Sequence, residues 1–297
     1  MTWQVTLPCT RAEAERIEAS GEDEAAADAP VLVATEEAED RWRLDAYFER
    51  RPDGKALAAL LVAVPSAAGT RPKPRLVAEQ DWVTLSQQGL EPIRAGRFFV
   101  HTPAHRDAAP AGAVRLEIAA GRAFGTGHHE TTTGCLEALD ALKRQGFVAR
   151  DLIDVGTGSG LLAFAAMRLW PIARATASDI DPVSIEVTRE NAAVNGVAMG
   201  AGPERLALAV APGLDHPVLA RRAPYDLVIA NILARPLIEL APALAGALLP
   251  GGRIVLAGLL SSQAERVARA YRREGLRSAF TVLRGEWPTL VLRRPRR

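Results

Sequence analysis

The stretch Asp154-Val155-Gly156-Thr157-Gly158-Ser159-Gly160 directly follows the apolar run Leu152-Ile153. Glycines at this spacing let a strand turn sharply into a helix, and they bring backbone N–H groups close to a bound nucleoside, where side chains would clash. Asp179 lies 19 positions beyond Gly160, near the ~20-residue interval at which a second strand end presents a carboxylate to ribose hydroxyls. Dinucleotide sites read G-x-G-x-x-G, whereas this chain reads G-x-G-x-G behind an aspartate. The combination predicts a site for S-adenosylmethionine (SAM).

Apolar runs and amphipathic stretches alternate around this turn. They predict strands over 152–155, 175–179, 206–210, 227–230 and 254–257, with helices over 161–169, 182–195, 236–249 and 261–274. Two last strands, over 278–284 and 289–293, are close enough in sequence to pair antiparallel. This alternation predicts an α/β, Rossmann-like, doubly wound sheet with an antiparallel last strand, whose ligands bind at the carboxyl ends of the strands.

The first 80 residues show a different order of elements. Their pattern predicts strands over 3–7, 30–35, 41–49 and 75–79, with helices over 11–20 and 54–64. The order βαββαβ is typical of a small α+β ferredoxin-like domain. We therefore predict a ferredoxin-like domain over 1–80, an interdomain linker helix over 81–96 and the larger domain over 97–297.

The net charge of +1 hides an asymmetry along the chain. Residues 1–80 hold 10 Lys/Arg and 15 Asp/Glu, whereas residues 81–297 hold 26 and 20. The acidic N-terminal part suits a basic protein partner better than a nucleic acid. No apolar stretch is long enough for a membrane span, no secretion signal is visible, and the two cysteines form no disulfide framework. We expect a cytoplasmic monomer that binds neither membranes nor nucleic acids directly.

Two further groups of polar residues are expected at the carboxyl ends of the strands. Asn231 follows the apolar strand at 226–230, and an amide at this place resembles the Asn/Asp loop of methyltransferases that act on amine and amide nitrogens. An amine nucleophile needs an acceptor to hold its hydrogens and aim its lone pair. A strand-end asparagine that only caps the next helix is the competing interpretation.

The second group is Phe124-Gly125-Thr126-Gly127-His128-His129-Glu130-Thr131-Thr132. Its glycines permit a tight loop, and Thr131 and Thr132 at the following helix start offer hydroxyl and N–H groups to a carboxylate. The paired histidines lack a third ligand at a metal-site spacing and do not form H-E-x-x-H, so we expect no metal. The chain also contains no G-x-S-x-G and no P-loop, which argues against serine hydrolases and nucleotide triphosphatases.

Taken together, these motifs resemble the ribosomal protein L11 methyltransferase (PrmA-like) family. The resemblance rests on 124–132, 154–160, Asp179-Ile180-Asp181-Pro182, Asn191-Ala192-Ala193-Val194-Asn195-Gly196 and Ala230-Asn231-Ile232-Leu233, and it extends through Pro250-Gly251-Gly252 and Glu286-Trp287. It implies a class I SAM-dependent protein methyltransferase that modifies the N-terminal α-amine and lysine side chains of a large-subunit ribosomal protein, with the N-terminal domain recognising the substrate. Carried over, the cofactor contacts are Thr132, Gly156, Asp179 and Asn231, with Thr126 and Gly158 close by, and Asn231 aligns the amine.

Two alternatives remain open at this stage. A lysine methyltransferase of another protein, such as the electron-transfer flavoprotein β-subunit, would share the catalytic domain, but the βαββαβ domain favours the ribosomal substrate. A non-catalytic, ribosome-associated binding protein would carry a degenerate site, and intact Asp154, Gly156, Asp179 and Asn231 argue against it.

Overall fold

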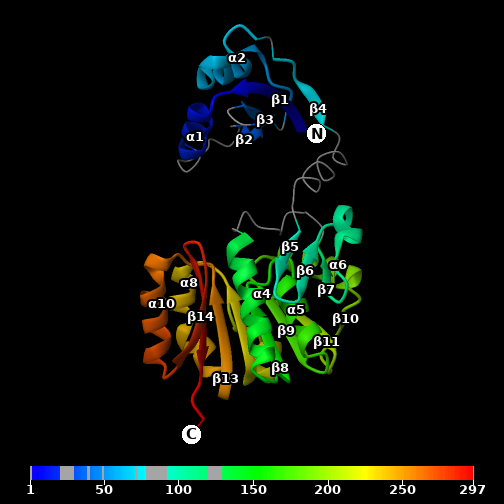
Figure 1. Cartoon of the computed structure of the whole chain (residues 1–297), viewed down its shortest axis with the longest axis vertical. Coiled ribbons are helices and arrows are strands. Elements are labelled where there is room, and N and C mark those ends of the chain that lie inside the picture. Colours follow the sequence, from blue (N-terminus) through cyan, green and yellow to red (C-terminus); the bar gives the residue numbers. More distant parts are fainter. Residues whose placement is uncertain are drawn as a thin grey trace. The chain divides into compact units, whose positions relative to one another are not determined.

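The computed structural model describes residues 2–20, 30–38, 41–48, 50–70, 72–77, 92–118 and 129–296. The chain forms two compact units, Met1–Ser86 and Gln87–Arg297 (Figure 1). Phe124, Thr126 and most of the predicted linker helix lie outside the described residues.

The N-terminal unit is an antiparallel sheet with two helices on one face. Its strands are β1 (Thr2–Cys9), β2 (Val31–Ala38), β3 (Arg41–Phe48) and β4 (Arg75–Val77), in the order β2-β3-β1-β4. The helices are α1 (Arg11–Ser20) and α2 (Gly54–Ala63), which contribute Ala14 and Leu60 to a core with Val5, Leu7 and Leu44. This is the ferredoxin-like order of elements that the sequence predicts.

A buried carboxylate joins the start of α1 to the turn after α2. Glu13 accepts hydrogen bonds from the backbone N–H of Thr10 at 2.7 Å and of Ser66 at 2.8 Å. Burial alone would raise the pKa of Glu13, but the hydrogen bonds from Ser66 and Thr10 outweigh it and lower the pKa to about 2. Glu13 is therefore ionised at neutral pH although its side chain is 5% exposed.

The C-terminal unit contains an eight-stranded sheet in the order β10-β11-β9-β8-β12-β13-β15-β14. Its strands are β8 (Asp151–Val155), β9 (Arg174–Asp179), β10 (Ala198–Met199), β11 (Arg205–Val210), β12 (Tyr225–Asn231), β13 (Leu248–Ala257), β14 (Arg277–Arg284) and β15 (Trp287–Arg293). Only β15 runs against its neighbours, because it pairs antiparallel with both β13 and β14. The sheet has the doubly wound order with an antiparallel last strand that the sequence predicts.

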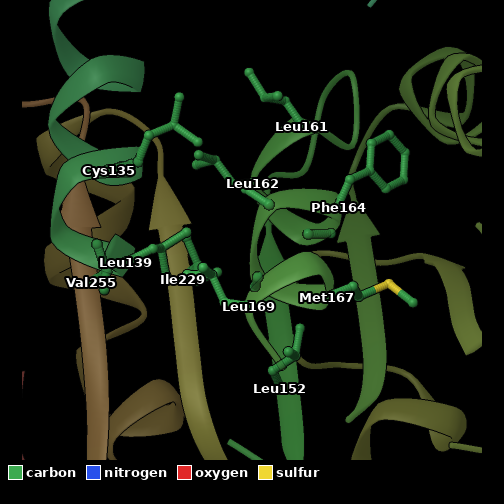
Figure 2. Packing of buried hydrophobic residues seen from close by; sticks show 14 of the residues in the cluster. Cys135, Leu139, Leu152, Leu161, Leu162, Phe164, Met167, Leu169, Ile229 and Val255 are labelled. Carbon is green, nitrogen blue, oxygen red and sulfur yellow. The ribbon is translucent and has the colours of Figure 1, made fainter. Parts of the chain in front are cut away.

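Both faces of this sheet are covered by helices. Along β12, Leu227 and Ile229 face one core cluster, and Val228 and Ala230 face the other, which explains why the strand reads as a continuous apolar run. The first cluster packs under α4 (His129–Arg144) and α5 (Leu161–Leu169), with Ala192 of α6 (Pro182–Val194), and part of it is drawn in Figure 2. The second packs under α7 (Pro217–Arg222), α8 (Ala234–Glu239), α9 (Ala241–Gly246) and α10 (Ser261–Arg273).

The segment predicted as a single helix over 236–249 is different in the structure. It forms the two short helices α8 and α9, and Leu248 already belongs to β13. Pro242 has no N–H to offer the carbonyl group of Ile238, and its ring would collide with that carbonyl in a continuous helix. The C-cap of α8 is Leu240, whose N–H donates to the Pro236 carbonyl at 2.9 Å.

A smaller sheet lies beside α4 and α5. It consists of β5 (Ile93–Ala95), β6 (Phe98–His101) and β7 (Val114–Glu117). The last residues of the predicted linker helix are therefore a strand, in which Ile93 and Ala95 are buried and Arg94 is exposed. That two-residue period is typical of a half-buried strand.

Candidate functional site

The glycine turn joins β8 to α5 at the carboxyl edge of the large sheet. Gly156, Gly158 and Gly160 have φ angles of 72°, 55° and 84°, which only glycine adopts without strain. A Cβ atom at Gly156 would collide with Cγ2 of Ile232, and one at Gly160 would collide with the Phe164 ring. The turn is therefore a strand-to-helix connection, as the sequence predicts, and it packs directly against Ile232, the residue after β12.

Helix α6 holds the turn in place through two buried side chains. The Thr188 hydroxyl donates to the carbonyl of Gly158 at 2.9 Å, and the Asn191 amide donates to the carbonyl of Ser159 at 2.9 Å. Both residues are at most 1% exposed. With these carbonyl groups bound on the protein side, the fold fixes the conformation of the turn before any ligand arrives.

Asp179 ends β9 beside the turn, and its carboxylate is held by two backbone groups. Oδ2 accepts from the N–H of Gly158 at 2.9 Å, and Oδ1 accepts from the N–H of Asp181 at 3.0 Å. Each carboxylate oxygen can accept two hydrogen bonds, so one acceptor position remains on each. Two free positions on a fixed carboxylate match the two hydroxyl groups of a ribose.

Asp154 lies beneath the turn and is 1% exposed. Its Oδ2 accepts from the Thr157 hydroxyl at 2.7 Å and from the N–H of Ala163 at 3.2 Å, while its buried Oδ1 has no partner among the described residues. Desolvation by burial raises the pKa of Asp154 to about 7, with hydrogen bonds from Thr157 and Ala163 opposing the shift. A fixed turn, an oriented Asp179 and a buried acceptor without a partner fit a polar nucleoside ligand at this edge.

Asn231 is the last residue of β12 and pairs with Ala257 of β13, while the residue before it, Ala230, pairs with Val155 of β8. No hydrogen bond joins its side-chain amide to another described residue. The N-cap of α8 is Leu233, which has no side-chain capping bond, so Asn231 does not cap that helix. The structure thus rejects the competing interpretation and leaves the Asn231 amide available to a ligand.

The loop after Asn231 packs closely against two glycines. Ile232 contacts Gly156, and its backbone passes so close to Gly258 that a Cβ there would collide with the Ile232 carbonyl. Gly258 has a φ angle of 83° and follows the end of β13. The sequence analysis did not single out Gly258, because this close approach is made by two strands that are adjacent only in the fold.

Of the two remaining predicted site residues, the structure describes only one. Thr132 lies in the first turn of α4 and is half-buried, whereas Thr126 lies outside the described residues. The structure therefore brings Gly156, Gly158, Asp179 and Asn231 to one edge of the sheet, and the roles of all the predicted site residues stay predictions. Among the described residues, no group of three His, Cys, Asp or Glu side chains could hold a metal ion.

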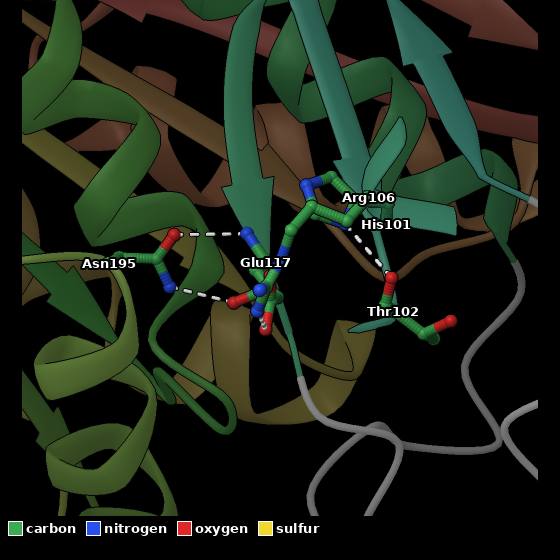
Figure 3. Close-up of polar contacts among 5 residues, drawn as sticks. All are labelled: His101, Thr102, Arg106, Glu117 and Asn195. Atoms are coloured by element: carbon green, nitrogen blue, oxygen red, sulfur yellow. Dashed lines mark hydrogen bonds and ion pairs between the residues drawn. The ribbon is translucent and has the colours of Figure 1, made fainter. Parts of the chain in front are cut away.

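A contact that the sequence analysis missed joins α6 to β7. Figure 3 shows the Asn195 amide, which accepts from the N–H of Glu117 at 2.9 Å and donates to its carbonyl at 2.7 Å. The Glu117 carboxylate in turn accepts two hydrogen bonds from Arg106, both of 2.8 Å. Helix α6 therefore fixes both the glycine turn, through Asn191, and the end of β7, through Asn195.

The match with known proteins spans almost the whole chain. The family model "Ribosomal protein L11 methyltransferase (PrmA)" matches residues 3–295. The chain belongs to this family. It is 41% identical over 269 residues to the ribosomal protein L11 methyltransferase of Agrobacterium fabrum, with 89% of each chain covered. It is 43% identical over 289 residues to that of Brucella suis, with 95% of this chain and 96% of the relative covered.

A solved structure of the same family has the same architecture in the part it shares. The crystal structure of ribosomal protein L11 methylase from Lactobacillus delbrueckii subsp. bulgaricus matches with a TM-score of 0.58 at 26% identity, covering 69% of this chain and 98% of that chain. Family membership confirms the predicted resemblance, the class I methyltransferase fold and SAM as the cofactor. No helix among the described residues is long and apolar enough to span a membrane.

Proposed function

We propose that this chain methylates the N-terminal α-amine and lysine ε-amines of ribosomal protein L11 in the cytoplasm, with SAM as the methyl donor. The observation that carries the proposal is the amide of Asn231, which no described residue hydrogen-bonds and which ends β12 one residue before the loop that packs against the glycine turn. Residues 1–80 recognise the substrate in this proposal, and residues 97–297 perform the transfer.

The residues around the turn have distinct roles in holding the cofactor. Asp179 accepts the ribose hydroxyl groups with the two acceptor positions left by Gly158 and Asp181. Gly156 and Gly158 let the backbone approach the nucleoside, and Thr132, with Thr126, binds the methionine carboxylate. The bound cofactor supplies a methyl group already activated by its sulfonium.

The protein's remaining task is to hold a neutral amine in line with that methyl group. The Asn231 amide oxygen accepts a hydrogen from the amine and directs the nitrogen lone pair, with the Ile232 carbonyl as a neighbouring acceptor. A lysine has an unperturbed pKa of ~10.4 and an α-amine one of ~8, so both lose a proton to solvent before they react. No described side chain at the edge is required as a base in this scheme.

The test is methylation of purified L11 by wild-type protein and by Asn231→Ala, with intact-mass and peptide mass spectrometry. We expect kcat to fall on the order of 10²-fold, because an aligned acceptor contributes a few kcal/mol to the transition state. The thermal unfolding temperature should stay unchanged, because Asn231 makes no hydrogen bond to a described residue. Asn231→Asp keeps an acceptor oxygen and should retain more activity than Asn231→Ala.

Three outcomes would overturn the proposal. Equal turnover by the folded Asn231→Ala variant would remove Asn231 from the mechanism. Methylation of the electron-transfer flavoprotein β-subunit in preference to L11 would establish the alternative substrate. Absence of any SAM-dependent methylation by a SAM-binding protein would favour a non-catalytic binding role.

A further inference from the structure

Three arginines stand in one row across the last strands of the large sheet. In the strand register, Arg253 of β13 is opposite Arg293 of β15, and Arg293 is opposite Arg277 of β14. Side chains of directly opposite residues lie on the same face of a sheet, and like charges there destabilise the pairing. The fold therefore brings three positive charges together at a cost in stability.

The chain end adds a fourth arginine to the row. The N–H of Gly251 donates to the Arg294 carbonyl at 2.9 Å, so the residues after β15 fold back against the turn within β13. A Cβ atom at Gly251 would lie 3.0 Å from Nε of Arg296, which places that side chain next to the turn. We call Arg253, Arg277, Arg293 and Arg296 the arginine cluster.

No acidic side chain neutralises the arginine cluster within the described part of the chain. None of its four members forms an ion pair with a described aspartate or glutamate, whereas Arg174 pairs with Asp151 at 2.7 Å and Arg106 pairs with Glu117 at 2.8 Å. Burial lowers the pKa of Arg253, and the charges of Arg293 and Arg296 lower it further. The charges of the neighbouring guanidinium groups therefore add to the larger effect of burial.

The end of α4 extends the positive charge on the same face. Helix α4 packs against β13, β14 and β15 and ends with Lys143 and Arg144, where it leads to the start of β8. The acids at this end have partners elsewhere. Asp140 is paired with Arg97 and, at 3.2 Å, with Arg144. Asp151 pairs with Arg174 at 2.7 Å, and Asp226 accepts from the backbone N–H of Arg150 at 2.8 Å. The amino-end edge of the sheet is therefore basic, and it is the edge opposite the cofactor turn.

We propose that the arginine cluster binds the phosphate groups of RNA. Guanidinium groups bind phosphate through paired hydrogen bonds, and a row of them without acidic partners is stabilised by a polyanion. Arg277 and Arg293 are exposed, whereas Arg253 already donates to the carbonyl groups of Gly251 and Gly252. Neighbouring strands are about 4.8 Å apart, so the three-strand row spans about 10 Å, enough for more than one phosphate of a strand. The choice of RNA over another polyanion rests on the proposed function, because L11 is a ribosomal protein and RNA is the polyanion of the ribosome.

This inference departs from the sequence-based expectation of no direct nucleic-acid binding. That expectation weighed charge along the chain, where Arg253 and Arg277 lie far from the basic tail at 293–297, which is interpreted as a solvated end. Strand pairing brings them into one row. The proposed surface leaves the Asn231 edge open, so the enzyme could rest on RNA while its opposite edge reaches a protein amine.

The test measures binding of the full-length protein to a fluorescein-labelled RNA hairpin over a series of salt concentrations. The variant is Arg277→Gln with Arg293→Gln, and the matched control is Arg266→Gln with Arg269→Gln on α10, where both arginines are exposed. Both pairs remove two charges. We expect on the order of tenfold weaker binding for the cluster variant, and a salt dependence of log K that is shallower by about one for each arginine removed. The control should change affinity less than threefold or so.

The cluster variant should fold, because it relieves repulsion, and its thermal unfolding temperature should not decrease. Equal weakening in the two variants would reduce the effect to overall charge and overturn the inference. Tighter binding of polyglutamate or of phosphatidylglycerol vesicles than of RNA would replace RNA by an acidic protein or a membrane. Methylation of free L11 by the cluster variant should match wild type. If free L11 is not methylated by either protein, the proposed function fails while RNA binding is still measured independently.

Discussion

At the scale of single residues, the free energy of unfolding should depend on pH most directly through the carboxyl group of Asp154. Burial raises its pKa to about 7, and Thr157 and Ala163 supply hydrogen bonds that only partly oppose the shift. In the unfolded chain an aspartate has a pKa of ~3.9. Between these two values the native state holds a proton that the unfolded state has lost. The free energy of unfolding therefore falls as pH rises from about 4 to about 7, and this contribution is constant above 7.

The variant Asp154→Asn should lose this dependence, because an amide does not titrate. Urea unfolding of both proteins across this pH range should show the variant gaining stability relative to wild type by a few kcal/mol between pH 4 and 7. The difference in unfolding free energy between the two proteins removes the contribution of other carboxyl groups, which both proteins share. Glu13 is one of these groups, and its lowered pKa makes stability rise with pH. Parallel curves for the two proteins would mean that Asp154 is ionised in the native state.

At the scale of elements, α6 is the part of the fold that positions the site. The Asn195 side chain forms three hydrogen bonds, two to the backbone of Glu117 and one of 2.8 Å to the Asn191 carbonyl, and the residue is 8% exposed. Asn195→Ala should lower the free energy of unfolding by about 1–3 kcal/mol, because it leaves backbone groups of β7 without partners. The control is Arg106→Ala, which removes an exposed ion pair from the same Glu117 and should change stability little. Equal effects of the two substitutions would contradict the assignment.

The sequence predicts those elements whose signals are local. Glycine spacing and strand-end polarity are properties of a short stretch, so the sequence reveals the turn at 154–160, Asp179 and Asn231. The observed helix α5 also has the predicted bounds. The Asn195–Glu117 contact joins residues 78 positions apart and leaves no local pattern. The same holds for Gly258 against Ile232 and for the arginine cluster, which exist only once strands are paired. The break between α8 and α9 was open to prediction from Pro242, but the apolar pattern around it favoured one helix.

At the scale of the whole molecule, charge is distributed unevenly between the two units and within the larger one. Residues 1–80 carry an excess of acids, and the arginine cluster lies at the edge of the large sheet away from Asn231. In our proposals, a basic protein substrate is attracted to the N-terminal unit and a polyanion to the arginine cluster, which does not include the Asn231 edge. The two proposed partners would therefore contact different residues of the chain.

The division of labour between the units can be tested by removing the first 80 residues. A truncated chain of residues 81–297 keeps every described cofactor residue and the whole compact unit Gln87–Arg297, so it should bind SAM with the affinity of the full chain, which also verifies that it folds. It should lose most methylation of intact L11, because the amine is no longer delivered to Asn231 at high effective concentration. Added salt should weaken L11 binding by the full chain and have less effect on the truncated one, since the acidic unit supplies the attraction. Similar rates of L11 methylation by the two proteins at equal SAM saturation would show that recognition lies in the C-terminal unit, and the acidic character of residues 1–80 would then need another partner.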